Sequence, residues 1–140
     1  MESSSDQRIA LITGASSGFG AAVSRKLAAE GWHCIVAARR RERLEELVSE
    51  IGGEAEVCDV SDRAQVDEMA ARLAQRHDAL HLLVNNAGIP GRGGFLDIEP
   101  ERIEQVMRTN YLGNVWTMLA LLPLLEAGAP SDIATVASVA

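Results

Sequence analysis

The feature that most constrains this chain is a glycine-rich loop placed directly after an apolar run. Residues 13–20 read TGASSGFG and follow the apolar residues 9–12. A short, continuously apolar run is typical of a strand buried on both faces, and the residues after the loop recur at helical spacing. The pattern therefore predicts a strand, a tight glycine turn and a helix, in that order.

This arrangement favours an anion-binding corner. The first turn of a helix presents free N–H groups and the positive end of the helix dipole, which suit a pyrophosphate. Glycine lets the backbone turn sharply and lets phosphate oxygens approach without meeting a Cβ. We expect Gly14 to make the turn, Gly18 to allow the close approach and Gly20 to pack the helix on the strand. An ordinary tight turn is the alternative, but the whole pattern favours a bound dinucleotide.

Apolar runs and amphipathic patterns alternate along the chain. Strands are predicted at residues 9–12, 34–38, 56–58, 80–84 and 133–137. Helices are predicted from apolar stripes at Phe19, Ala22, Val23 and Leu27, at Leu44, Leu47, Val48 and Ile51, at Val66, Met69, Ala70 and Leu73, and over residues 101–127. Either Ser61 or Asp62 is expected to cap the third helix. The alternation predicts an α/β fold, a doubly wound parallel sheet with helices on both faces.

Charge and composition argue against several classes of partner. The formal net charge of −7 disfavours nucleic acid and anionic membrane surfaces. No apolar run approaches the roughly 20 residues of a membrane span, and residues 1–6 do not resemble a signal peptide, so we expect a cytoplasmic location. Cys34 and Cys58 lie in apolar runs, where a thiol acts as a small hydrophobic group. The histidines, at positions 33, 77 and 81, show no ligand spacing, so no metal site is predicted.

Four further motifs follow the glycine loop, and the set resembles the short-chain dehydrogenase/reductase family. They are Asp59-Val60 after the third run, Asn85-Asn86-Ala87-Gly88 after the fourth, Asn110 in the long helix and Ser138 after the fifth. The resemblance implies a Rossmann-like fold that is incomplete after the fifth strand. It also implies a dinucleotide site formed by Gly14, Ser16, Ser17, Gly18, Phe19, Gly20, Arg39, Asp59, Val60, Asn86, Ala87 and Gly88.

The choice of cofactor depends on the end of the second strand. A carboxylate at that position would bind a ribose 2′-hydroxyl and repel a 2′-phosphate. The chain has Ala38 there, followed by Arg39, whose guanidinium can form paired hydrogen bonds with a phosphate, and Arg40 is a possible helper. We therefore expect NADP rather than NAD, although the loop itself lacks a basic residue.

The resemblance implies hydride transfer between the nicotinamide and a small carbonyl or alcohol substrate. Ser138 would hold the substrate oxygen and Asn110 would anchor a water, beside a tyrosine whose pKa is lowered by a lysine four residues later. The only tyrosine, Tyr111, is followed four places later by Val115, and the only lysine is Lys26. We therefore expect the chain to be the N-terminal part of a longer enzyme and to be inactive alone.

Two other functions stay open, a non-catalytic NADP-binding regulatory module and a structural subunit that completes another chain's sheet.

Residues 1–7 are expected to form a disordered tail, and residues 8–140 the dinucleotide-binding domain. The helix over residues 110–125 is apolar on most faces, so we also expect a homo-oligomer that associates through it.

Overall fold

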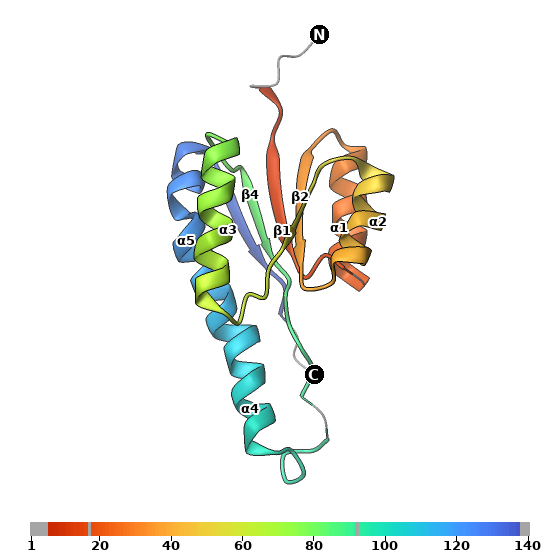
Figure 1. Cartoon of the computed structure of the whole chain (residues 1–140), viewed down its shortest axis with the longest axis vertical. Coiled ribbons are helices and arrows are strands. Elements are labelled where there is room, and N and C mark those ends of the chain that lie inside the picture. Colours follow the sequence, from red (N-terminus) through yellow and green to blue (C-terminus); the bar gives the residue numbers. More distant parts are fainter. Residues whose placement is uncertain (1–5, 17, 92, 138–140) are drawn as a thin grey trace.

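Five parallel strands form one sheet, and helices cover both of its faces (Figure 1). The computed structural model describes residues 6–16, 18–91 and 93–137. The elements are β1 (Ile9–Thr13), α1 (Gly18–Ala29), β2 (His33–Ala38), α2 (Arg41–Ile51), β3 (Glu54–Val57), α3 (Arg63–Arg76), β4 (Leu82–Asn85), α4 (Pro100–Met107), the π-helical segment η2 (Arg108–Leu112), α5 (Gly113–Ala127) and β5 (Asp132–Thr135).

The strands lie in the order β3-β2-β1-β4-β5. The chain runs outward from β1 through β2 to β3, then crosses back to place β4 on the other side of β1. In sheets of this kind, ligands bind beyond the carboxyl ends of the strands, where the direction of winding reverses. The predicted α/β class with a doubly wound parallel sheet is confirmed, and the winding reverses between β1 and β4.

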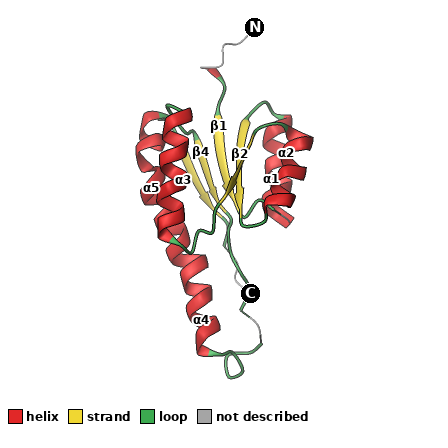
Figure 2. Cartoon of the chain, viewed as in Figure 1, coloured by secondary structure: helices red, strands yellow, loops and turns green. Residues whose placement is uncertain are grey.

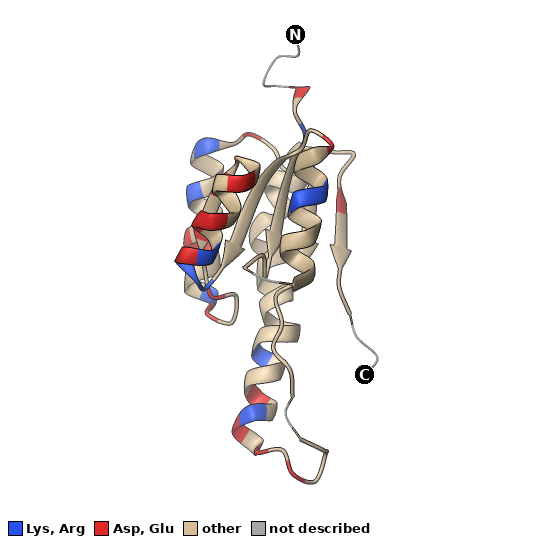
Figure 3. Ribbon diagram, turned by 90° about the vertical axis from the view of Figure 1, so that its right-hand side faces the viewer, with Lys and Arg blue, Asp and Glu red and all other residues tan. Residues whose placement is uncertain are grey.

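Alternating residues of the central strands pack into two separate hydrophobic cores, one on each face of the sheet. Leu11 of β1 packs with Met69 of α3 and Leu121 of α5 on one face of the sheet. Its neighbour Ile12 packs with Leu44 of α2 on the other face. The central strands β1, β2 and β4 contain no Lys, Arg, Asp or Glu, and the charged residues lie mainly on the helices and in the loops (Figure 3). Burial on both faces therefore explains the continuously apolar strands.

The buried face of α1 agrees only in part with the predicted one. Val23 and Leu27 of the predicted stripe are partly buried against the core, but Phe19 is 60% exposed and Ala22 is exposed. The fully buried residues of α1 are Gly20, Ala21 and Ser24, because the helix lies so close to β1 that only small side chains fit. Ser24 donates its hydroxyl hydrogen to the carbonyl of Gly20 at 2.8 Å, which satisfies this buried polar group.

β3, β4 and β5 depart from the predicted bounds. β3 begins at Glu54, two residues before the predicted start, because its pairing with β2 begins there, with Glu54 opposite Ile35. β4 begins at Leu82 rather than Leu80. β5 ends at Thr135, and its four residues are exposed, although a buried strand was expected, since none of the described segments covers it.

Two local predictions about helices are confirmed. Asp62, not Ser61, caps α3, because its Oδ1 accepts hydrogen bonds from the N–H groups of Ala64 (3.0 Å) and Gln65 (3.4 Å). Residues 100–127 are helical throughout, as α4, η2 and α5, and α4 extends beyond the sheet (Figure 2). None of the described helices is long and apolar enough to cross a membrane.

Candidate functional site

A cavity of about 590 Å³ lies at the carboxyl edge of the sheet. The segments that follow β1, β2, β3 and β4 form its walls, and α4 and η2 close one side. The lining residues that sequence analysis also singled out are Gly14, Ser16, Arg39, Arg40, Asp59, Val60, Asn86, Ala87 and Gly88. The cavity therefore joins motifs that are up to 74 positions apart along the chain.

The glycine loop fits against the segment after β4 with no room for a side chain at Gly14. This residue has φ +62°, and a Cβ on it would stand 2.9 Å from backbone atoms of Asn86 and Ala87. Gly18 begins α1 with φ +58°, and a Cβ there would meet nothing within 4 Å. A Cβ on Gly20 would strike the carbonyl oxygen of Gly14. Gly14 thus makes the turn and Gly20 the close packing, as expected, while the backbone at Gly18 is open to an approaching group.

Hydrogen bonds lock the loop to the segment after β4. The Oγ1 atom of Thr13 accepts hydrogen bonds from the N–H groups of Asn86 (2.9 Å) and Ala87 (3.0 Å) and donates to the carbonyl of Val84. The side-chain amide of Asn86 donates to the carbonyl of Gly14 at 3.1 Å. Sequence reasoning gave Thr13 no role, although its place directly before Gly14 was the available signal. These bonds hold two walls of the cavity in fixed register.

Asn110 lies in the π-helical segment and anchors the loop after β4. Its Oδ1 accepts a hydrogen bond from the N–H of Ile89 (2.8 Å), and its Nδ2 donates to the carbonyl of the same residue (2.9 Å). A Cβ on Gly88 would stand 3.3 Å from that Oδ1. Single π-helical turns within α-helices are frequent at functional sites. Asn110 thus stands beside the cavity wall, whereas Ser138 lies outside the described residues.

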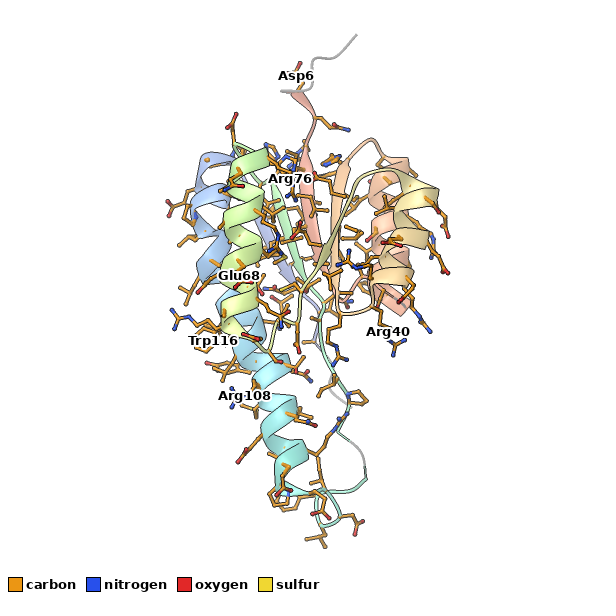
Figure 4. The ribbon with its side chains drawn as sticks, in the orientation of Figure 1. Asp6, Arg40, Glu68, Arg76, Arg108 and Trp116 are labelled. Carbon is orange, nitrogen blue, oxygen red and sulfur yellow. The ribbon has the colours of Figure 1, made fainter. Side chains whose placement is uncertain are left out.

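The cavity is positively charged although the chain is acidic. Its lining includes four arginines, at positions 39, 40, 102 and 108, and one carboxylate, Asp59. In the part of the chain that the structure describes, Arg39 and Arg40 form no salt bridge. Arg40 lies at the start of α2 and Arg108 in η2, as the labels in Figure 4 show. The two arginines beyond residue 100 were missed, because no local motif links them to the glycine loop.

The other predicted positions differ in how they meet the cavity. Asp59 holds the turn after β3, because its Oδ1 accepts hydrogen bonds from the N–H (3.0 Å) and hydroxyl (2.7 Å) of Ser61. Phe19, Gly18 and Gly20 do not line the cavity. The side chain of Phe19 is exposed, and Gly18 lines an adjoining hollow together with Ser16 and Arg40. Ser17 lies outside the described residues.

This arrangement can bind an elongated anion. The guanidinium group of Arg39 lines the cavity, and the first turn of α1, with its free N–H groups, borders an adjoining hollow at Gly18. Ser16 and Arg40 line both, so the two regions are contiguous. The tight fit around Gly14 leaves backbone, not side chains, facing the site. The residues present therefore fit a dinucleotide, with its pyrophosphate near Gly18 and further phosphate near Arg39.

Comparisons with known proteins agree with this geometry. The family model described as short chain dehydrogenase matches residues 8–140. An NADP-dependent 3-hydroxy acid dehydrogenase of Shigella flexneri is 37% identical, over 82% of this chain and 48% of its own length. The chain spans about half the length of the curated relatives it matches.

Solved structures with the same fold include complexes with either nicotinamide cofactor. A variant of actinorhodin polyketide ketoreductase with NADPH has a TM-score of 0.87 and 30% identity, and the match covers 98% of this chain and 55% of the other. A 3-ketoacyl-(acyl-carrier-protein) reductase of Brucella melitensis with NADH has a TM-score of 0.87 and 32% identity, over 94% of this chain and 57% of the other.

Proposed function

Because the chain belongs to the short-chain dehydrogenase family, an oxidoreductase family, we propose that it binds NADP(H) as the cofactor-binding part of a carbonyl or alcohol oxidoreductase. The observation that carries this proposal is the pair of arginines after β2, which face the same cavity as the glycine loop. Neither has an acidic partner among the described residues. A 2′-phosphate would supply that partner, whereas the free ribose hydroxyl of NAD would not.

Each part of the cavity has a distinct role in this proposal. The N–H groups at the start of α1 hold the pyrophosphate, Arg39 binds the 2′-phosphate with help from Arg40, and Asp59 and Val60 flank the adenine. Asn86, Ala87 and Gly88 close the pocket around the rest of the cofactor. Bound there, the nicotinamide supplies or accepts a hydride at the substrate carbon.

The hydride transfer is accompanied by a proton transfer, which needs an acid or base. In this chain the tyrosine and the lysine that could serve do not lie together. A phenol with an ordinary pKa of about 10 needs a nearby cation to work near neutrality. Tyr111 lies in η2, while Lys26 pairs with Glu30 on α1, 3.6 Å away. We therefore propose that these 140 residues bind nucleotide without turning it over, with Asn110 and Ser138 as their contribution to the catalytic set.

The cofactor assignment is tested by titrating the chain with NADPH and NADH, followed by nucleotide fluorescence. Arg39→Asp should weaken NADPH binding by about 10- to 150-fold, the loss expected for about 1.5–3 kcal/mol of charge-assisted hydrogen bonding. The matched control is Arg41→Asp, which makes the same change of charge at the exposed first residue of α2, outside the lining of the cavity and of the hollow at Gly18. It should alter NADPH affinity by less than about threefold.

The results that would contradict this assignment are distinct. Unchanged NADPH affinity in Arg39→Asp would remove the proposed 2′-phosphate site. Tighter binding of NADH than of NADPH by the unaltered chain would reverse the cofactor preference. Rapid oxidation of NADPH by the 140-residue chain with simple ketones or aldehydes would refute the proposal that it binds without turnover.

We also propose that the chain forms a homo-oligomer through residues 110–125. Thr117, Leu121 and Leu125 bury one face of α5, while Leu119 on the opposite side is 59% exposed and Leu122 is 44% exposed. Burying such side chains contributes about 1.5–3 kcal/mol each. Light scattering should give a mass above 15.0 kDa, and Leu119→Glu should return it to that of the monomer. A monomeric mass for the unaltered chain would contradict the proposal.

A further inference from the structure

A cluster of two imidazoles and a carboxylate lies at the opposite edge of the sheet from the cavity. His33 is the first residue of β2, Glu54 is the first residue of β3, and His77 follows the last residue of α3. Arg76, next to the cluster, is labelled at the upper end of the sheet in Figure 4, whereas Arg40 is labelled at the lower end. The proposed nucleotide site does not use any of these residues.

The three side chains converge on one atom. The Nε2 atoms of His33 and His77 lie 2.6 Å and 2.5 Å from the same carboxylate oxygen, Oε2 of Glu54. The three candidate ligand atoms all lie within 4.8 Å of one another. The side chains are only 15–25% exposed, so they are fixed by their surroundings but still open to an ion from solvent.

We propose that His33, Glu54 and His77 form a binding site for a divalent transition metal ion, and that Zn²⁺ is the ion that fits best. Zn²⁺ prefers imidazole nitrogens and carboxylate oxygens at about 2.0–2.2 Å, in tetrahedral geometry. Two histidines and one glutamate supply three ligands and leave the fourth position to water. Mg²⁺ and Ca²⁺ favour sets made mostly of oxygen atoms, which this cluster does not offer.

Only small movements separate the present geometry from coordination. Ligands on a tetrahedral zinc stand about 3.3 Å apart, so each imidazole must withdraw from the carboxylate by less than about 1 Å. Each Nε2 must also present its lone pair to the metal. A neutral imidazole achieves this by carrying its proton on Nδ1 instead of Nε2.

The neighbouring arginines orient the carboxylate and leave the right oxygen free. Arg76 donates from its Nε to Oε1 of Glu54 at 2.8 Å, so Oε2 faces the two histidines. The charge of Arg76 is shared with Glu56, whose oxygens also accept from Arg72. The hydrogen bond from Arg76 therefore holds the carboxylate in one orientation, as partners beyond the ligands do in metal sites.

A bound ion would connect three elements of the fold. β2, β3 and the residue that follows α3 each contribute one ligand, and these residues are 21 and 23 positions apart along the chain. An ion that binds the folded chain and not the unfolded one raises the temperature of unfolding as its concentration rises. Zn²⁺ should therefore link these elements on the β3 side of the sheet and raise the temperature of unfolding.

Isothermal titration with ZnCl₂ tests the site, in the full chain and in single variants. The unaltered chain should bind one ion, and His33→Gln and His77→Gln should each weaken that binding by at least about tenfold. His81→Asn is the matched control, because His81 is the third histidine of the chain, and its Nδ1 only accepts a hydrogen bond from the N–H of Ile9, at 3.0 Å. Asparagine keeps that acceptor, so the control should bind Zn²⁺ within about twofold of the unaltered chain.

Cobalt provides a second readout that needs no variant. Co²⁺ added to the unaltered chain should give the intense visible absorption of a four-coordinate site, and Zn²⁺ should abolish it. The proposal is overturned if the chain binds no Zn²⁺, or if His33→Gln and His77→Gln bind as well as the unaltered chain. It is equally overturned if His81→Asn loses as much affinity as they do. In those cases the cluster is a hydrogen-bonded carboxylate without a metal function.

Discussion

Alanine at Gly14 and alanine at Gly18 introduce the same side chain at two positions with almost the same backbone conformation. Their φ values are +62° and +58°. The surroundings differ, because a Cβ on Gly14 would stand 2.9 Å from backbone atoms of Asn86 and Ala87, whereas a Cβ on Gly18 meets nothing within 4 Å. The pair therefore separates the cost of the left-handed conformation from the cost of crowding against the segment after β4.

The expected losses of Tm follow from two costs, that of the left-handed conformation and that of crowding. A residue other than glycine in the left-handed region costs about 1–2 kcal/mol, and both variants bear that cost. Gly14→Ala must also displace packed backbone, which adds about 1–3 kcal/mol. For a chain of 140 residues, each kcal/mol lowers Tm by about 3 °C. We expect Gly18→Ala to lower Tm by about 3–6 °C and Gly14→Ala by about 6–15 °C.

Circular dichroism at 222 nm during heating measures both values under one set of conditions. Any effect of alanine on the unfolded chain is nearly the same in the two variants, so it cancels in the difference. If Gly14→Ala lowers Tm by no more than Gly18→Ala, the loop does not fit tightly against Asn86 and Ala87. Gly14 would then have room for a side chain, and bare backbone would not be required there.

Three further predictions concern single groups. Asp62→Ala should lower the free energy of unfolding in urea by about 1 kcal/mol, because it removes the cap of α3. Asp67 is exposed, so Asp67→Ala should change that free energy by under about 0.5 kcal/mol. Equal losses in the two variants would contradict the cap. The pKa of Glu54 is lowered on folding from its ordinary value of 4.5, so its stabilisation is present above that pH and lost as the pH falls below it. Glu54→Gln should therefore flatten the acid limb of a stability–pH curve, and an unchanged limb would refute this. Burial raises the pKa of Cys34 and of Cys58 to about 11. Both thiols should therefore react slowly with Ellman's reagent at pH 8 in the folded chain and rapidly in guanidinium. Rapid reaction of the folded chain would contradict their burial.

Local patterns in the sequence were sufficient for the class of fold. The continuously apolar strands and the amphipathic helices between them are short-range signals, and they predicted the parallel sheet with helices on both faces. The order of the strands is a property of long-range pairing, so no local pattern indicated it. The face of α1 was predicted only in part, because Val23 and Leu27 pack on the core while the close approach at Gly20 leaves Phe19 exposed.

In the candidate site, too, local motifs were found from the sequence, and residues that only the fold brings together were not. The glycine loop and Asn86 to Gly88 were found because each is a compact motif placed directly after a strand. Arg102 and Arg108 reach the cavity only because α4 and η2 extend past the sheet. The cluster of His33, Glu54 and His77 was missed for a similar reason, since its members are far apart along the chain and meet only when the strands align.

The most direct test of the central claim is an amide NMR titration of the ¹⁵N-labelled chain with NADP⁺. The claim is that the pyrophosphate rests on the N–H groups at the start of α1, beside the loop that begins at Gly14. We expect the largest shifts at the amides of Gly14, Ser16 and Gly18, with little change at Glu54 and His77 on the opposite edge. Saturating NADP⁺ that leaves the three loop amides unmoved, or shifts only amides elsewhere, would contradict the claim.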